Sequence, residues 1–363
     1  MLISYLRSSS QSKFVFCQHS FYLEYVLGFR PGANYKADMG TCTHKALEIL
    51  GYWKLATQNN EPTFTDGETG VIFSRDNMTV DKAINCAWEF YTKPTTQETQ
   101  WGLKGKIIAR STPFEWEQSH KDTIAEWVYA ALKYNDGMFS VLKRNVVTPE
   151  KYFDIELPHE WAKYKYKSTT GEIFEGRWSI KGTMDLVTKI DDDTLEVVDY
   201  KSGKCLDWNN MKPKDFTSLT RDAQLILYFY AARKLFPQYK TIMMTIFFIR
   251  DGGAYTLPYD ESHERYAELM LRQNFEKIQA TMKPALLNPS KNKNDWLKCN
   301  RFCHFGKTKF LDEATNQLTD QTICAKMREE IVTLGIDRVQ EKWGKPGANN
   351  TYQGGGKTIE AAP

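Results

Sequence analysis

Two carboxylates and one lysine near the middle of the chain have the spacing of a catalytic group. Thirteen residues separate Asp185 from Asp199, and Lys201 lies two positions after Asp199. On a β-strand, residues i and i+2 point to the same face, so Asp199 and Lys201 should project together. Two crowded carboxylates repel each other unless a cation lies between them. Two acids, a divalent metal ion and an ammonium group are the parts needed to attack a phosphodiester bond.

Two strands joined by a turn are expected to position these side chains. Thr194–Asp199 alternates in polarity and is rich in β-branched residues, and Ile180–Val187 can be its partner strand. The acidic triplet Asp191–Asp193 between them predicts a turn. This pairing brings Asp185 alongside Asp199.

The chemistry of such a site follows from its ligand types. Carboxylate oxygens suit Mg2+ or Mn2+, which lowers the pKa of a bound water and neutralises charge on a phosphate. Lys201 would orient that water or stabilise the phosphate as a fixed positive charge. The alternative is a surface hairpin with a salt bridge, because D-x-K is common on strands.

The residues around this triplet extend the pattern over most of the chain. The stretch from Gly182 to Gly203 resembles the RecB-like branch of the PD-(D/E)XK nuclease superfamily, in which G-x-x-D precedes D-Y-K-[ST]-G. The resemblance covers residues 5–330. Three further motifs occur in the family's order. An opening serine–cysteine–aromatic segment lies at Ser8–Tyr22, a G-T-x-x-H-x-x-L-E helix at Gly40–Glu48, and a Q-x-x-x-Y helix at Gln224–Tyr228.

The resemblance implies a role for each matched residue. It implies Mg2+ or Mn2+ as the cofactor and Lys201 as the residue that activates the attacking water. The implied metal ligands are His44, Asp185, Asp199 and the backbone carbonyl of Tyr200. It also implies that Gln224 and Tyr228 line the cleft and touch the DNA strand.

Each of these residues also has a purely structural interpretation. Because His44 lies on a predicted helix among apolar residues, it can be interpreted as a hydrogen-bonded core histidine. Gln224 and Tyr228 are four residues apart on an apolar helix over 222–235, so a buried tyrosine capped by a glutamine explains them equally well. Glu156 lies in the strand-like stretch Tyr152–Leu157. One interpretation makes it a further acid near the metals, and the favoured one places it on a solvated strand face.

The cysteines predict a second metal site. The chain has seven cysteines, an odd number, and is expected to have no signal segment, which argues against a disulfide framework. Cys42 and Cys86 are expected to be core thiols. Closely spaced thiolates with a distant partner are typical of zinc or iron–sulfur sites. In the iron–sulfur members of the RecB-like branch, one N-terminal and three C-terminal cysteines hold a [4Fe–4S] cluster, which here implies Cys17, Cys299, Cys303 and Cys324.

The cysteine spacing departs from the family in two places. Three residues separate Cys299 from Cys303, and twenty separate Cys303 from Cys324. His304 in place of one cysteine would favour Zn2+, and free thiols are the remaining alternative. Either metal would join the two ends of the nuclease domain and would be structural.

Composition adds little to the choice of partner. The net charge is +3, so DNA binding depends on local basic patches, and the aromatic content of 13% argues against disorder. No apolar run approaches the length of a membrane span, and a cytoplasmic protein of a bacterial or phage-infected cell is expected. The candidate patches are Lys104–Arg110, Lys163–Lys167 and Lys291–Lys307. For Lys163–Lys167, an exposed hairpin is favoured over a contact with DNA.

We therefore expect an α/β fold with a central mixed sheet flanked by helices. Helices are predicted over Asp81–Tyr91, Ile124–Lys133 and Glu261–Thr281, and a buried strand over Thr241–Arg250. The expected organisation begins with an N-terminal helical part with Cys17 and His44 (residues 1–50) and a helical insertion (51–150). The catalytic core (151–285), a cysteine-containing segment (286–343) and a flexible tail (344–363) are expected to follow.

The function expected from the resemblance is a metal-dependent DNA nuclease, with an exonuclease on single-stranded or frayed ends as the favoured form. Recombination, repair and phage DNA metabolism are the settings considered. Possible partners besides DNA are a helicase, a recombinase or a single-strand-binding protein. The alternative is a DNA-binding or assembly module that keeps the nuclease fold and works through a helicase or recombination partner.

Overall fold

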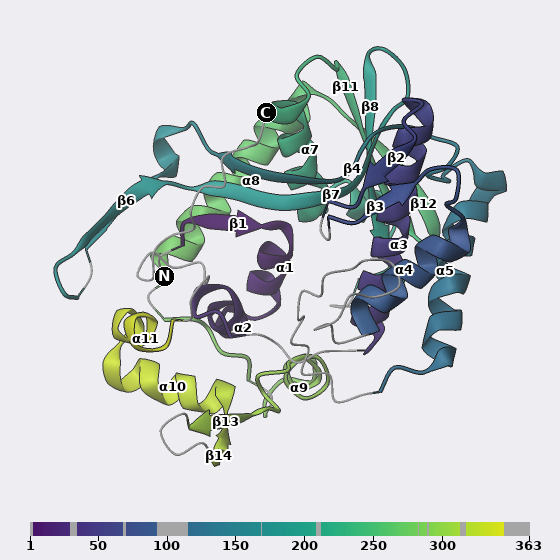
Figure 1. Ribbon diagram of the computed structural model, residues 1–363. Coiled ribbons are helices and arrows are strands. Elements are labelled where there is room, and N and C mark those ends of the chain that lie inside the picture. Colours follow the sequence, from purple (N-terminus) through teal and green to yellow (C-terminus); the bar gives the residue numbers. More distant parts are fainter. Residues whose placement is uncertain are drawn as a thin grey trace. The chain divides into compact units, whose positions relative to one another are not determined.

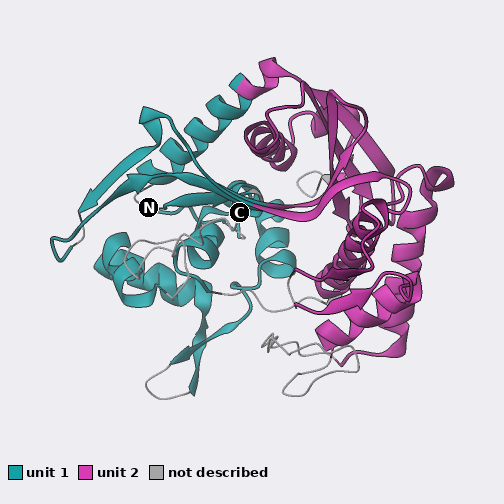
Figure 2. Ribbon diagram, turned by 45° about the horizontal axis from the view of Figure 1, so that its top comes forward, with its two compact units in different colours: residues 1–31, 153–182, 265–363 teal, residues 32–152, 183–264 magenta. Residues whose placement is uncertain are grey.

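The computed structural model divides the chain into two compact units (Figures 1 and 2). Unit 1 consists of residues 1–31, 153–182 and 265–363, and unit 2 consists of residues 32–152 and 183–264. The structure describes residues 3–29, 35–67, 70–92, 115–167, 169–207, 212–281, 283–288, 290–312 and 317–344.

A mixed sheet forms the centre of the fold. Its strand order is β1-β7-β8-β11-β12, and β4 also pairs with β7. The pairing is parallel between β8 and β11 and antiparallel between β7 and β8 and between β11 and β12. The predicted mixed sheet flanked by helices is thus confirmed. The strand bounds are β1 (Tyr5–Arg7), β4 (Asn145–Glu156), β7 (Ser179–Lys189), β8 (Thr194–Lys201), β11 (Thr241–Phe248) and β12 (Gly253–Tyr259).

The hairpin of β7 and β8 is the element that the sequence predicts. Leu186 pairs with Val198, so the antiparallel register leads directly to Asp185 and Asp199. The turn closes through the Asp191 carboxylate, which accepts a hydrogen bond from the Asp193 N–H at 2.9 Å. Aspartate favours this turn because its short side chain can bond its own backbone two residues on.

Helices cover both faces of the sheet in unit 2. A core cluster joins apolar residues of α3 (Tyr35–Gln58), α4 (Val80–Thr92) and α5 (Gln118–Gly137) to Val198 and Tyr200 of β8. Helix α7 (Ala223–Leu235) contacts β8 and β11. Its Gln224 bonds Asp199, which lies on the strand face opposite Val198 and Tyr200. The helices predicted over Asp81–Tyr91 and Ile124–Lys133 are confirmed as α4 and α5.

Unit 1 contains both described ends of the chain. Strand β1 runs parallel to the first part of β7, and Trp178 stacks on Phe275 of α8 at a ring-centroid distance of 4.1 Å. Helix α8 confirms the long helix predicted over Glu261–Thr281. The helices here are α1 (Ser8–Phe16), α2 (Gln18–Phe21), α8 (Glu261–Ala280), α9 (Lys293–Leu297), α10 (Ile323–Leu334) and α11 (Ile336–Trp343), with π-helical turns at Tyr22–Val26 and Lys298–Phe302.

Short elements complete the two units. In unit 1, β5 (Lys163–Lys167) and β6 (Ile173–Arg177) form a hairpin, as do β13 (Lys309–Asp312) and β14 (Gln317–Thr322). The remaining elements are β2 (Thr63–Thr65), β3 (Ile72–Ser74), β9 (Leu206–Asp207), β10 (Lys212–Pro213), α6 (Phe216–Leu219) and a 3-10 turn at Glu160–Ala162.

Several sequence predictions about exposed segments can be compared with these elements. The stretch Lys163–Lys167 is an exposed hairpin strand, and Lys165 pairs with Glu175 at 3.1 Å. Glu156 is on an exposed face, 3.9 Å from Arg177, as the solvated-strand interpretation expects. Among the described helices, none combines the length and apolarity needed to cross a membrane. The Lys104–Arg110 patch and most of the 344–363 tail lie outside the described residues.

Candidate active site

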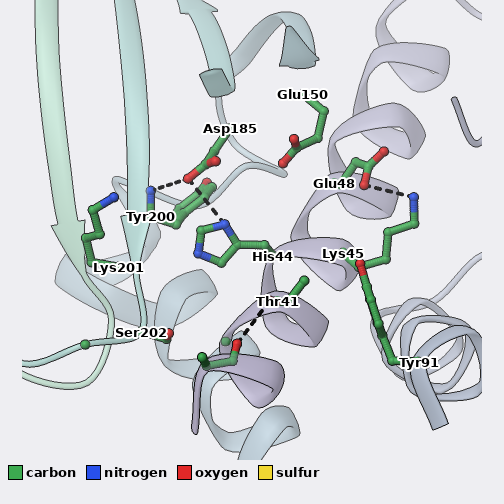
Figure 3. A pocket seen from close by; sticks show the side chains of 13 residues that line it. Thr41, His44, Lys45, Glu48, Tyr91, Glu150, Asp185, Tyr200, Lys201 and Ser202 are labelled. Carbon is green, nitrogen blue, oxygen red and sulfur yellow. Dashed lines mark hydrogen bonds and ion pairs between the residues drawn. The ribbon is translucent and has the colours of Figure 1, made fainter. Parts of the chain in front are cut away.

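An open cavity of about 460 Å³ in unit 2 collects most of the predicted site residues (Figure 3). Helix α3 contributes His44, β7 contributes Asp185, and the end of β8 contributes Tyr200 and Lys201. These residues are far apart in the sequence, and the sheet brings them to one wall. Asp199 is not part of the cavity lining, but it contacts Lys201 directly.

Asp185 is the centre of the polar contacts in the cavity. Its Oδ2 accepts a hydrogen bond from the Tyr200 N–H at 2.7 Å and lies 3.4 Å from His44 Nδ1. Burial favours the protonated carboxyl, but the positive charges of His44 and Lys201 outweigh it and lower the pKa of Asp185. Burial likewise disfavours a charged imidazole, but Asp185 outweighs it and raises the pKa of His44. Asp185, which is partly exposed to the cavity, is thus held as a carboxylate.

Asp199 and Lys201 form an ion pair next to Asp185. Lys201 Nζ lies 2.6 Å from Asp199 Oδ2, which confirms that the two side chains share one face of β8. Burial raises the pKa of Asp199 to about 6, with the nearby Asp185 charge adding to it and Lys201 opposing it. Burial would lower the pKa of Lys201, but Asp199 and Asp185 outweigh it and raise that pKa. Lys201 therefore carries a proton and acts as a fixed positive charge.

Gln224 holds this pair in place. Its amide N–H group donates to Asp199 Oδ1 at 2.9 Å and to the Tyr228 hydroxyl at 3.1 Å. Its carbonyl oxygen accepts from Lys201 Nζ at 3.0 Å. Asp222 caps the helix beneath it by accepting from the Gln224 backbone N–H. Gln224 and Tyr228 do form the expected pair on one helix face, and their predicted contact with DNA stays a prediction.

Glu150 is the residue of the cavity that the sequence did not reveal. Its carboxylate oxygen, Asp185 and His44 present one ligand atom each, and these atoms lie within 4.8 Å of one another. An imidazole nitrogen with carboxylate oxygens fits a divalent cation such as Mn2+ or Mg2+. In the sequence, Glu156 is the further acid with a strand-like pattern, and Glu150, directly after Pro149, belongs to no motif.

A buried ion cluster supports α3 behind the cavity. Lys45 Nζ lies 2.9 Å from Glu48 Oε2 and 2.5 Å from Asp66 Oδ1, and all three residues are buried. His44 and Glu48 are four residues apart, so they share one face of the helix, and both line the cavity. The cluster fixes the helix that carries His44.

Helix α3 and the end of β8 approach each other closely at Gly40. A Cβ atom on Gly40 would stand 2.3 Å from Ser202 Oγ and 3.3 Å from Ser202 Cβ. A side chain at position 40 therefore forces Ser202 or the helix to move, and both elements carry cavity residues. The close approach of Ser202 explains why the first position of the predicted G-T-x-x-H motif is a glycine in this chain.

If the chain has the DNA-cleaving activity that its motifs predict, Gly40→Ala is expected to lower that rate about 10–100-fold, because it displaces His44 from the strand that carries Lys201. Single-turnover cleavage of a labelled oligonucleotide measures this effect. Adding Ser202→Gly removes the clash and should restore most of the rate, while Ser202→Gly alone serves as the control. Cleavage by Gly40→Ala at the wild-type rate would mean that this contact does not position the site.

The four predicted cluster cysteines come together in unit 1. Cys17, Cys299, Cys303 and Cys324 line one small pocket with Leu23 and Phe305. Burial raises the pKa of the Cys324 thiol to about 12, with the three other cysteines adding to it. His304, considered as a replacement ligand, lies instead beside Thr308 at 2.7 Å. Elsewhere, Cys42 and Cys86 are buried core thiols, as predicted.

A family comparison relates this chain to known proteins. No curated protein matches the chain. Among solved structures, one similar chain is from Eubacterium rectale and is described as a "Putative exonuclease". It is 12% identical, with a TM-score of 0.40 over 76% of this chain and 80% of that one. The family described as the PD-(D/E)XK nuclease superfamily matches residues 8–307. The chain belongs to the PD-(D/E)XK nuclease superfamily.

Proposed function

We propose that the chain is a metal-dependent deoxyribonuclease of the RecB-like branch that degrades DNA from single-stranded or frayed ends. The observation that carries this proposal is the Asp199–Lys201 ion pair at 2.6 Å beside the Asp185–His44 contact at 3.4 Å. Two acids, an imidazole and an ammonium group beside one open cavity are suited to phosphodiester hydrolysis. Family membership supports the reaction type, and the preference for DNA ends is part of the proposal.

The proposed division of labour follows from the contacts of each residue. His44, Asp185, Asp199 and the Tyr200 carbonyl would hold Mg2+ or Mn2+, which when bound supplies a water of lowered pKa and offsets phosphate charge. The Lys201 ammonium orients the attacking water and stabilises the added negative charge on the phosphate. Gln224 keeps that ammonium aimed, since it accepts a hydrogen bond from Lys201 and donates one to Asp199. The DNA strand would then pass Gln224 and Tyr228.

End-labelled and closed substrates test the exonuclease part of the proposal. With Mn2+ present, a linear strand should release short labelled products, while a covalently closed single-stranded circle should stay intact. Substrates labelled at the 5′ or the 3′ end then report the direction of digestion. Cleavage of the circle as fast as the linear strand would contradict the exonuclease proposal and would leave the nuclease assignment in place.

We further propose that the four clustered cysteines hold a [4Fe–4S] cluster with a structural role. Burial raises the thiol pKa of Cys17, Cys299 and Cys324, so a bound cation would be needed to hold these sulfurs together as thiolates. The four cysteines line one small pocket, and the resemblance to the iron–sulfur members of the RecB-like branch favours the cluster over zinc.

Metal analysis of protein purified without air tests this proposal. We expect about four iron atoms per chain and a brown colour. Cys324→Ala should lose both the iron and much of the stability of unit 1, whereas Cys205→Ala should keep the iron because Cys205 is buried outside the group. One zinc ion per chain with no iron would contradict the cluster.

A further inference from the structure

Glu150 lies beside His44 and Asp185, where it could be a further protein ligand for the catalytic cation. It enters the cavity from β4, and Figure 3 shows its carboxylate on the side of Asp185 and His44 away from Lys201. We propose that Glu150 binds the same divalent cation as His44 and Asp185. This inference rests on the proposed metal-dependent nuclease and adds to its ligand set a residue that none of the sequence motifs contains.

The carboxylates around the cavity have different neighbours. Asp199 has Lys201 at 2.6 Å and the Gln224 amide at 2.9 Å. Glu48 has the buried Lys45 ammonium at 2.9 Å. Glu150 is grouped with His44 and Asp185, with one ligand atom of each residue within 4.8 Å of the others. A cation between these three atoms would be bound by two carboxylates and one imidazole.

The backbone at Glu150 is unusual for a residue in a strand. Its φ is +42°, in the left-handed region, where a side chain with a Cβ atom is disfavoured. The other described non-glycine residues with positive φ are Asn60, Asn135 and Asp136, which are types that tolerate this conformation. Strain of this kind persists where the surrounding structure imposes it and often marks a functional site. Here it directs a glutamate into the cavity.

β4 packs closely against α3 at the residue before Glu150. A Cβ atom on Gly51 would stand 2.8 Å from Pro149 Cβ, so only a glycine leaves room for the proline. Gly51 lies seven residues after His44, two turns along the same face of the helix. β4 also pairs with β7, the strand of Asp185. His44 and Asp185 are therefore carried by α3 and β7, the two elements that contact the strand of Glu150.

The ligand types also predict which cation binds more tightly. Carboxylates accept Mg2+ and Mn2+ alike, whereas an imidazole ligand favours the transition metal. We expect wild-type protein to bind Mn2+ more tightly than Mg2+ in the absence of DNA. Isothermal titration with each metal alone measures this preference, and equal or tighter Mg2+ binding would contradict the three-residue site.

Three substitutions test the role of Glu150 through Mn2+ affinity. Glu150→Gln keeps the shape of the side chain and should weaken Mn2+ binding at least about tenfold, because it removes one charged ligand. Asp185→Asn should weaken it as well. Glu156→Gln, an exposed glutamate on the same strand, is the matched control and should bind Mn2+ as the wild type does.

Glu150→Gly separates a metal ligand from a structural residue. Glycine adopts positive φ without strain, so this variant should be as stable to urea as the wild type, or more stable, while its Mn2+ affinity falls. Wild-type Mn2+ affinity in Glu150→Gln and Glu150→Gly, with loss in Asp185→Asn, would overturn this inference and leave the proposed function intact. Failure of the wild type to bind Mn2+ and to cleave DNA would overturn both.

Discussion

Replacing Lys201 with methionine is expected to lower the rate of DNA cleavage at least about 10²–10³-fold, the typical effect of removing one charge-stabilising donor. Methionine keeps the length of the side chain but removes the ammonium that contacts Asp199 and Gln224. Because Lys201 lines the surface of an open cavity, the fold should survive the change. Rapid-quench cleavage of a labelled oligonucleotide measures the rate, and circular dichroism checks the fold.

Lys204→Met is the matched control for this prediction. Lys204 is exposed and lies three residues after Lys201, so its substitution removes the same charge near the same place. We expect it to change DNA affinity slightly and the single-turnover rate hardly at all. Equal loss of rate in the two variants would mean that general charge, rather than the position of the Lys201 ammonium, promotes the reaction.

The second large effect concerns stability rather than catalysis. We expect Lys45→Met to lower the free energy of unfolding by about 3–5 kcal/mol, because it removes the ammonium between two buried carboxylates. The side chains of Lys45, Glu48 and Asp66 are 2%, 8% and 1% exposed, so water does little to screen the remaining charges. Urea denaturation followed by tryptophan fluorescence measures the change.

The design of this experiment includes a rescue and a control. Adding Glu48→Gln and Asp66→Asn to Lys45→Met neutralises the whole cluster and should recover part of the lost stability. Lys36→Met, at an exposed position of the same helix, should change the free energy of unfolding by less than about 0.5 kcal/mol. A Lys45→Met variant as stable as Lys36→Met would show that the ion cluster does not support α3.

The sequence predicted the hairpin at the centre of the site because its information is local. Alternation and β-branched residues define β7 and β8, and the acidic triplet between them defines the turn. The register that brings Asp185 to Asp199 then follows from a short connection. His44 and Gln224 were identified only through the order of the motifs, since neither helix contains a feature that requires chemistry by itself.

Glu150 and the Lys45 cluster could not be predicted because they depend on tertiary packing. The position of Glu150 is set by a left-handed backbone and by the contact between Pro149 and Gly51, which no periodic pattern reveals. Asp66 lies 21 residues after Lys45, in a segment with no helical or strand repeat that links the two. The second role of Gln224, as a bridge between Asp199 and Lys201, likewise required the geometry of α7 against β8.

The most direct test of the central claim is the metal dependence of DNA cleavage by the purified chain. A labelled single-stranded oligonucleotide is incubated with wild-type protein and with Asp199→Asn, in EDTA, Mg2+ or Mn2+. We predict cleavage by the wild type in Mg2+ or Mn2+, no cleavage in EDTA, and background cleavage by Asp199→Asn under every condition. Equal cleavage in EDTA, equal cleavage by the variant, or DNA binding without any cleavage by the wild type would contradict it.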